Sequence, residues 1–167
     1  MSEVKVTKDL ENKKLVVEFE ANGTKDKVWQ AYADKELFEQ WWGPEGWETT
    51  TKEFSLTPGG KIHYGMKCVD ENQGDWFGQT SWGVMDVIEV NPNDNFTYTD
   101  YFSDEAGTLN NEMPALKVTN EFIEENGKTK IISTSFADSA EQIEQLVAMG
   151  MIEGFTSQLN KLDGLFA

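Results

Sequence analysis

The stretch from Asp138 to Phe166 constrains the fold of this chain most, because its apolar side chains recur at helical spacing. They fall in steps of four, four, four, four, three and four residues, at Ile143, Val147, Met151, Phe155, Leu159, Leu162 and Phe166. Such spacing is typical of one face of an amphipathic α-helix. Asp138 stands at the expected N-cap and Glu141 follows three residues later, as in a capping box. The sequence therefore predicts one long helix over about residues 139–165.

Two glycines, Gly150 and Gly154, lie one turn apart inside this predicted helix. Each costs about 1 kcal/mol relative to alanine in a helix interior, so the missing side chains need a reason. One interpretation is close packing of the helix on a sheet. The other is that the helix roofs a cavity and that the glycines leave room for a guest molecule.

The residues before this helix predict one strand, two short helices and then about six antiparallel strands. The first strand is expected at 15–20, the helices follow Thr24 and precede Gly43, and the later strands are expected at 47–56, 61–69, 75–90, 95–103, 116–123 and 129–136. Closely spaced turn signals favour an antiparallel meander over parallel units. Residues 1–12 are expected to be a flexible or edge segment, and residues 13–167 a single domain. The predicted fold class is α+β, with a curved antiparallel sheet wrapped around a long C-terminal helix.

Composition excludes several classes of partner. With 14 Lys and Arg against 30 Asp and Glu, the net charge is −16, and every basic residue is a lysine. So acidic a chain disfavours binding to nucleic acid and to anionic membranes. The single cysteine, Cys68, allows no internal disulfide and no cysteine-based metal site, so we expect no metal and no cofactor. Without a hydrophobic leader or a membrane-length apolar run, the sequence predicts a cytoplasmic protein.

Alternation along the strands predicts which side chains face the concave side of the sheet. The residues expected to line a ligand cavity between sheet and helix are Trp42, Ile62, Tyr64, Met66, Trp82, Phe96, Tyr98, Asp100, Phe102, Val118, Asn120, Phe122, Val147, Met151, Gly154 and Phe155. Asp100 and Asn120 are polar members of this set and need a partner from protein, water or ligand.

Two further faces matter for the site. His63 lies between Ile62 and Tyr64, so it is expected on the outer face of its strand, exposed to solvent and without a chemical role. In the last strand the pattern leaves two inward sets open, which are Ile131 with Ser133, or Ile132 with Thr134 and Phe136.

No catalytic constellation is visible in the sequence, and no residue is assigned a catalytic role. A Ser-His-Asp arrangement requires the lone His63 to point inward. An enzyme of the cyclase or isomerase type needs only a pocket with an acid–base pair, for which Tyr64, Tyr98 and Asp100 are candidates.

Several short motifs together resemble a known family. They are Trp41-Trp42-Gly43-Pro44-Glu45-Gly46, Leu56-Thr57-Pro58-Gly59-Gly60-Lys61-Ile62, the stretch 83–92 with Asn95-Phe96-Thr97-Tyr98, Gly127-Lys128-Thr129, and Gly150-Met151-Ile152-Glu153-Gly154-Phe155 with Leu159 and Leu162. From about residue 14 onward the chain is similar to the activator of heat-shock-protein-90 ATPase-like family of the START/polyketide-cyclase (SRPBCC) superfamily. It departs at Thr57, where that family commonly has an arginine, and at Ser133 and Ser135, where apolar residues are expected.

The resemblance implies a helix-grip fold with an internal cavity that often takes apolar molecules, and it brings no shared catalytic motif. The expected function is therefore binding of a small hydrophobic or aromatic molecule, as a carrier or sensor without turnover. The alternatives are a cyclase- or isomerase-like enzyme that uses a Tyr/Asp pair, and a co-chaperone-like domain that binds a chaperone partner. A monomer or a homodimer is compatible with the sequence.

Overall fold

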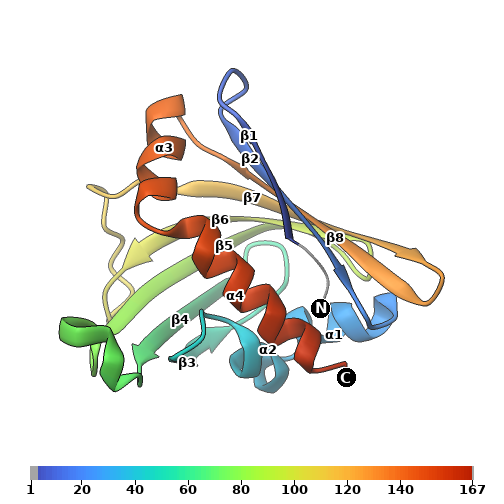
Figure 1. Cartoon of the computed structure of the whole chain (residues 1–167), viewed down its shortest axis with the longest axis horizontal. Coiled ribbons are helices and arrows are strands. Elements are labelled where there is room, and N and C mark those ends of the chain that lie inside the picture. Colours follow the sequence, from blue (N-terminus) through green and yellow to red (C-terminus); the bar gives the residue numbers. More distant parts are fainter. Residues whose placement is uncertain (1–3, 167) are drawn as a thin grey trace.

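The computed structural model describes residues 4–166 as one curved antiparallel sheet of eight strands with helices against its concave face (Figure 1). The strands are β1 (Val4–Asp9), β2 (Lys14–Ala21), β3 (Trp47–Phe54), β4 (Lys61–Cys68), β5 (Thr80–Asn91), β6 (Asn95–Ser103), β7 (Leu116–Glu125) and β8 (Lys128–Phe136). Their order across the sheet is β1-β2-β8-β7-β6-β5-β4-β3. The predicted α+β helix-grip fold is confirmed.

The largest differences from the predicted strand boundaries lie at the start of β5 and the end of β7. The segment before β5 is a short 3₁₀ turn, η1 (Glu71–Trp76), so that strand begins at Thr80 rather than at 75. In addition, β7 continues to Glu125, and the turn at Asn126-Gly127 leads directly into β8 with positive φ at both residues. Two central residues with positive φ match the right-handed twist of a tight hairpin.

The sheet curls because two of its strand pairs are irregular. The register shifts between Thr51 and Glu53 in the β3–β4 pair, and between Val87 and Glu89 in the β5–β6 pair. An extra residue in one strand bends it and increases the local twist. The curled sheet then encloses the C-terminal helices, and α4 crosses its concave side in Figure 1.

The C-terminal segment corrects the prediction of one long helix. It forms two helices, α3 (Ala140–Ala148) and α4 (Met151–Gly164), separated at Gly150, whose φ is +93°. A glycine with positive φ directly after a helix is a common C-terminal stop, because only glycine adopts this conformation without strain. The N-cap of α3 is Ser139, whose hydroxyl accepts a hydrogen bond from the Gln142 N–H, and not the predicted Asp138.

Helices α1 (Lys25–Ala33) and α2 (Lys35–Trp41) close one end of the space between sheet and α4. Their rings pack with those of β6 and β7 in an aromatic cluster made of Trp29, Tyr32, Phe38, Trp41, Trp42, Phe96 and Phe122. The Trp41 indole N–H donates to the Ala31 carbonyl at 2.8 Å, which satisfies the polar atom of a fully buried side chain. This end of the fold is therefore a filled core.

The segment after the paired tryptophans is hydrogen-bonded to α4. The Gln158 carboxamide oxygen accepts from the Gly43 N–H at 2.8 Å, and the Ser157 hydroxyl accepts from the Glu45 N–H at 2.6 Å. The Lys161 ammonium donates to the carbonyl oxygens of Gly43 and Trp47. These hydrogen bonds fix the position of α4 relative to the segment 43–47. Burial of the Lys161 ammonium lowers its pKa.

The face of the last strand, left open by the sequence, is now determined. Ile131 and Ser135 are buried at 1% exposure, and Ser133 also lies on the concave side. The inward set is therefore the one with Ile131 and Ser133.

His63 lies on the outer face as expected, but the prediction that it is exposed is wrong. Its exposed fraction is 9%, because the Trp82 ring and the loop at Asp104–Gly107 cover it. One ring nitrogen, Nε2, lies 3.0 Å from the Asp104 carbonyl oxygen.

Candidate functional site: a cavity under the C-terminal helices

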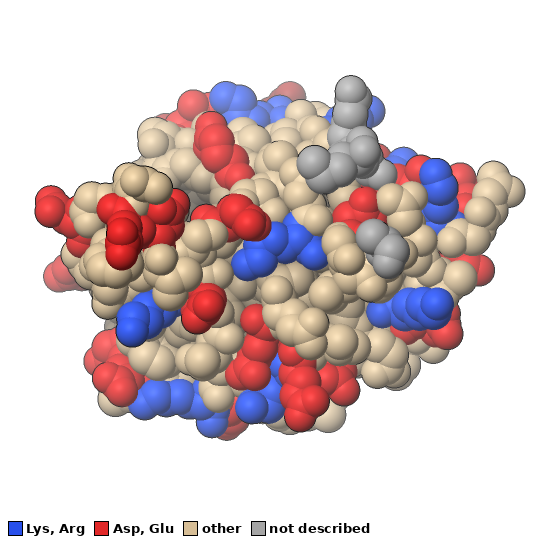
Figure 2. Space-filling model, turned by 60° about the horizontal axis from the view of Figure 1, so that its bottom comes forward, with Lys and Arg blue, Asp and Glu red and all other residues tan. Residues whose placement is uncertain are grey.

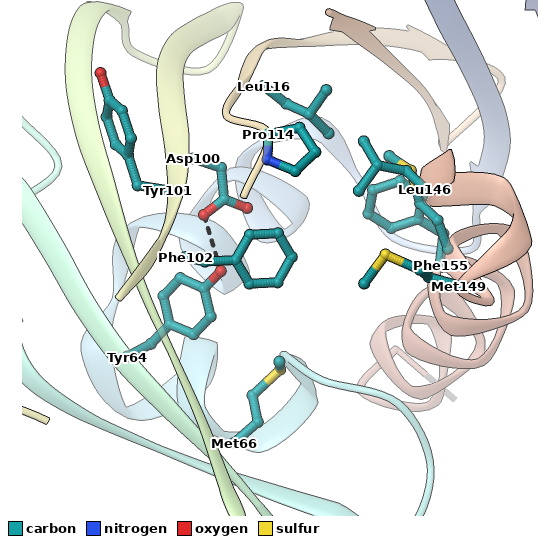
Figure 3. Close-up of a pocket in the computed structure, with 11 residues that line it drawn as sticks. Tyr64, Met66, Asp100, Tyr101, Phe102, Pro114, Leu116, Leu146, Met149 and Phe155 are labelled. Atoms are coloured by element: carbon teal, nitrogen blue, oxygen red, sulfur yellow. Dashed lines mark hydrogen bonds between the residues drawn. The ribbon is translucent and has the colours of Figure 1, made fainter. Parts of the chain in front are cut away.

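A cavity of ≈ 310 Å³ lies between the sheet and the junction of α3 and α4 (Figure 3). Its lining residues come from β4, β6, the start of β7, the preceding loop and both C-terminal helices, and they are Tyr64, Met66, Asp100, Tyr101, Phe102, Pro114, Leu116, Leu146, Met149, Met151 and Phe155. Met149 is 54% exposed, so the cavity meets solvent beside the α3–α4 junction. Tyr101 touches the cavity while its ring points away from it in Figure 3.

A single hydrogen-bonded pair marks the floor of this otherwise apolar cavity. The Tyr64 hydroxyl on β4 donates to the Asp100 carboxylate on β6 at 2.9 Å, across the intervening strand β5 (Figure 3). In the sheet, Asp100 lies between Met85 on β5 and Leu116 on β7. The carboxyl group is thus flanked by apolar side chains on both sides.

Gly83 on β5 makes this pair possible. It is the residue opposite Tyr64 in the β4–β5 register, and a side chain there would meet the ring. A Cβ atom built on Gly83 would come within 2.4 Å of the Tyr64 ring and hydroxyl. Because glycine has no side chain, the phenol can lie flat across β5 and reach the neighbouring strand.

The environment changes the protonation of the pair. Burial raises the pKa of Asp100 from 3.8 to about 7, although the hydrogen bond from Tyr64 acts in the opposite direction. Burial, with the nearby Asp100 charge, also raises the pKa of Tyr64 well above its ordinary value. The site therefore holds a phenol that stays protonated and a carboxyl group that titrates near neutrality.

A second, much smaller pocket of ≈ 20 Å³ adjoins the aromatic cluster. Its lining is more polar, with Tyr32, Tyr98, Asn120, Ser133 and Gln158 among Val17, Trp42, Phe155 and Leu159. This volume suits about one water molecule, and the site offers several polar partners for it. Phe155 borders both pockets, so its ring separates the apolar cavity from the polar one.

The structure places the predicted site residues in several different environments. The main cavity is lined by Tyr64, Met66, Asp100, Phe102, Met151 and Phe155, and the small pocket by Trp42, Tyr98, Asn120 and again Phe155. Four others, Ile62, Phe96, Val118 and Phe122, pack inside the core. Val147 is half-buried against the core and Gly154 faces open space, and neither lines a pocket.

Trp82 corrects the predicted set, because it lies on the outer face. Its ring lies over Gly65, where a Cβ atom would come within 2.5 Å, and packs against His63 at a centroid distance of 5.3 Å. The Lys52 ammonium lies 5.3 Å from the centre of the same ring. Apolar residues occur on both faces of β5, so its sequence gave no clear signal of which side faces inward.

Five residues that line the cavity were absent from the predicted set, namely Tyr101, Pro114, Leu116, Leu146 and Met149. Leu116 alternates with the predicted inward residues of its strand, so its position could have been predicted from the sequence. Leu146 and Met149 are not part of the stripe of apolar residues spaced by four. They reach the cavity because the chain breaks at Gly150 and α3 is oriented differently from α4. Pro114 belongs to an irregular loop with no periodicity.

Two features are absent from the part of the chain that the structure describes. Within residues 4–166, no group of three or more His, Cys, Asp or Glu side chains is placed to hold a metal ion. Over the same range, no helix is both long and apolar enough to cross a bilayer.

Comparison with known proteins identifies relatives of this fold. The family described as "Activator of Hsp90 ATPase homolog 1-like protein" matches residues 22–167. The crystal structure of protein Ms6760 from Mycobacterium smegmatis has 30% identity and a TM-score of 0.87, over 99% of this chain and 98% of that one. A solution structure from Arthrobacter aurescens has 26% identity and a TM-score of 0.87, over 97% and 90% of the two chains. The AHSA1 protein from Silicibacter pomeroyi, at 22% identity and a TM-score of 0.69 over 90% and 95%, shares the fold. No curated protein matches the sequence.

Proposed function

This chain belongs to the activator of Hsp90 ATPase homolog 1-like family, and on this premise we propose that it binds a small hydrophobic or aromatic molecule in the cavity beneath α3 and α4. It acts as a carrier or sensor that leaves the ligand unchanged, and its site of action is the cytoplasm. The observation that carries the proposal is the ≈ 310 Å³ cavity, which reaches solvent beside Met149.

The size and lining of the cavity support a small organic guest. Pockets for such ligands span roughly 300–1,000 Å³ and are lined mainly by apolar side chains with a few polar groups. Here one carboxyl and one phenol stand among leucine, phenylalanine and methionine side chains. Met66, Met149 and Met151 contribute flexible, polarisable thioethers, which adapt to guests of different shape.

A matched pair of substitutions on α4 tests the proposal with a neutral fluorescent naphthalene dye. Met151 lines the cavity, whereas its neighbour Ile152 borders a shallow groove on the outer side of the helix. Met151→Trp fills the cavity and is expected to weaken dye binding by about tenfold or more, a loss of roughly 1.4 kcal/mol. Ile152→Trp adds the same ring outside and is expected to leave the affinity unchanged. Equal effects of the two substitutions, or no dye binding to the wild type, would contradict the proposal.

The Tyr64–Asp100 pair supports one second candidate, a cyclase- or isomerase-like enzyme. A carboxyl group with a pKa near 7 beside a phenol is suited to move protons on a bound molecule. Native mass spectrometry of the protein as purified identifies a co-purified ligand, and incubation of that compound with fresh protein tests for conversion. A product that forms with the wild type and not with Asp100→Asn assigns the protein to the enzyme class.

The family name adds a third outcome for the same preparation. Stimulation of a chaperone ATPase by the purified domain, retained in Met151→Trp, would assign the protein to the partner-binding class instead.

A further inference from the structure

The polar side chains that line the main cavity carry either a carboxyl or a hydroxyl group. Among its lining residues only Asp100 carries a carboxyl group, and none is a lysine, histidine, asparagine or glutamine. The hydroxyl donor of Tyr64 is already used by Asp100. When Asp100 is ionised, a ligand therefore meets a negatively charged hydrogen-bond acceptor and no free cationic donor.

This arrangement discriminates among apolar ligands by their charge. When Asp100 is ionised, a carboxylate or sulfate ligand would bury a second negative charge beside it without a compensating donor, which is unfavourable. A neutral ligand leaves the Asp100 charge uncompensated when that group is ionised. A protonated amine supplies the missing positive charge and a hydrogen-bond donor at the same position.

The charge of the whole molecule acts in the same direction. The chain carries a net charge of −16, and the face drawn in Figure 2 carries acidic side chains with lysines interspersed among them. A field of this sign raises the local concentration of cations and lowers that of anions. The net charge of the molecule and the floor of the cavity thus favour the same ligand charge.

We propose that the ligand of this cavity is a hydrophobic amine, whose apolar body lies among the methionines and phenylalanines and whose ammonium group pairs with Asp100. The inference rests on the proposed function, since it names the chemical class of the molecule that the cavity binds. It requires no covalent step, because the amine is held by an ion pair and by apolar contact alone.

The pairing makes binding depend on pH through a single group. Facing Asp100 are Tyr64 from β4 and Tyr98 from its own strand, both with pKa values raised well above the usual tyrosine value. The lining residues on β7, α3, α4 and the loop before β7 are apolar, and so is its β5 neighbour Met85. The Tyr101 ring points away from the cavity (Figure 3). Asp100, with a pKa of about 7, is then the group that titrates near neutrality. An ammonium ligand binds the ionised form, so its affinity falls as the pH drops.

Three probes that share one apolar body test the inference on the full chain. They are naphthylmethylamine, a cation; naphthylmethanol, neutral; and naphthylacetate, an anion. At about pH 8 the amine is expected to bind at least tenfold more tightly than the alcohol, and the anion at least tenfold more weakly. Below about pH 7 the amine's affinity is expected to fall by about tenfold per pH unit, while that of the alcohol does not fall.

Two variants with the same change in net charge separate the local effect from the global one. Asp100→Asn removes the carboxylate from the cavity, and Glu11→Gln removes one at an exposed position in the β1–β2 turn. Asp100→Asn is expected to abolish the preference for the amine and keep alcohol binding, whereas Glu11→Gln keeps both. If Asp100→Asn fails to fold, the probe ranking and pH profile of the wild type decide alone.

The outcomes distinguish the two proposals. Binding of the alcohol without a preference for the amine overturns the amine assignment and leaves the proposed function standing. Retention of the preference in Asp100→Asn overturns it as well. Failure of all three probes to bind overturns both.

Discussion

At the scale of single residues, two glycines let aromatic rings lie flat on opposite faces of the sheet. Tyr64 crosses Gly83 on the concave face, and Trp82 covers Gly65 on the outer face. Each ring occupies the space that a side chain would fill, so each glycine fixes the position of one ring. The first arrangement forms the site, and the second covers His63.

Gly83→Ala is expected to displace the Tyr64 ring and break its hydrogen bond to Asp100, because the new methyl group would lie 2.4 Å from the phenol. Loss of a hydrogen bond to a charged group costs roughly 1.5–3 kcal/mol of unfolding free energy. The pKa of Asp100 should rise further, since that bond lowers it. Carboxyl-carbon NMR of Asp100 measures the pKa, and chemical denaturation measures the stability.

Gly65→Ala is the matched control. It crowds Trp82 to a similar degree, at 2.5 Å, on the face that does not touch the cavity. It should cost stability and leave the pKa of Asp100 unchanged. An identical Asp100 pKa in the Gly83→Ala variant and the wild type would contradict the described role of Gly83.

Asp100 also links stability to pH. Its pKa is raised from 3.8 to about 7 in the folded chain, so the folded state keeps a proton that the unfolded state has lost between these values. The stability contributed by the neutral carboxyl is fully present below about pH 4 and is lost as the pH rises through about 7. Asp100→Asn removes the titrating group, so the variant does not lose this stability as the pH rises. The variant should therefore gain stability over the wild type by on the order of 2–4 kcal/mol between about pH 4 and pH 8.

Thermal and chemical unfolding of both proteins across this pH range give the difference directly. A difference that stays constant from acid to alkaline pH would show that Asp100 titrates as an ordinary surface carboxylate.

At the scale of elements, the break between α3 and α4 shapes the cavity. It turns α3 so that Leu146 and Met149 face the cavity, where a continuous helix would present Val147. The sequence indicated an uninterrupted stripe because steps of four residues continue across Gly150. Apolar periodicity reports the spacing of buried side chains and is insensitive to one residue with positive φ between two helices.

The two glycines of this segment should respond in opposite ways to alanine. Gly150 has φ +93°, where an L-residue costs roughly 1–2 kcal/mol, so Gly150→Ala should destabilise the fold. Gly154 lies inside α4 with no atom within 4 Å of a built Cβ, so Gly154→Ala should be neutral or stabilise by about 0.5–1 kcal/mol. Melting temperatures of the two variants test this order. A sharp drop for Gly154→Ala would contradict the open space at that position.

At the scale of the whole molecule, the fold was predictable because most strands alternate and their turns carry clear signals. The strand with Ile62, Tyr64 and Met66 had its inward face assigned correctly from that alternation. The family resemblance, carried by the paired tryptophans and the glycine-containing terminal helix, was confirmed over residues 22–167.

The site was predictable only in part. Side chains on regular strands, such as Asp100 and Phe102, were found by alternation. Those on the loop before β7 and on α3 were not, since neither a loop residue such as Pro114 nor a change of helical phase leaves a periodic signal. Core and cavity residues on one face also share the same pattern, so Phe96 and Phe102 are equivalent in sequence. They differ in the structure because Trp29 on α1 packs against Phe96, which places Phe96 in the core, whereas Phe102 lines the cavity.

The most direct test of the central claim, that a small apolar molecule binds beneath α3 and α4, is methyl NMR of the methionines during titration with a neutral naphthalene compound. Met66, Met149 and Met151 line the cavity, while Met85 is buried at 2% exposure outside its lining. The three cavity methyl signals are expected to shift together with one dissociation constant, and the Met85 signal to move little. Binding that leaves the three cavity signals unchanged would contradict the account.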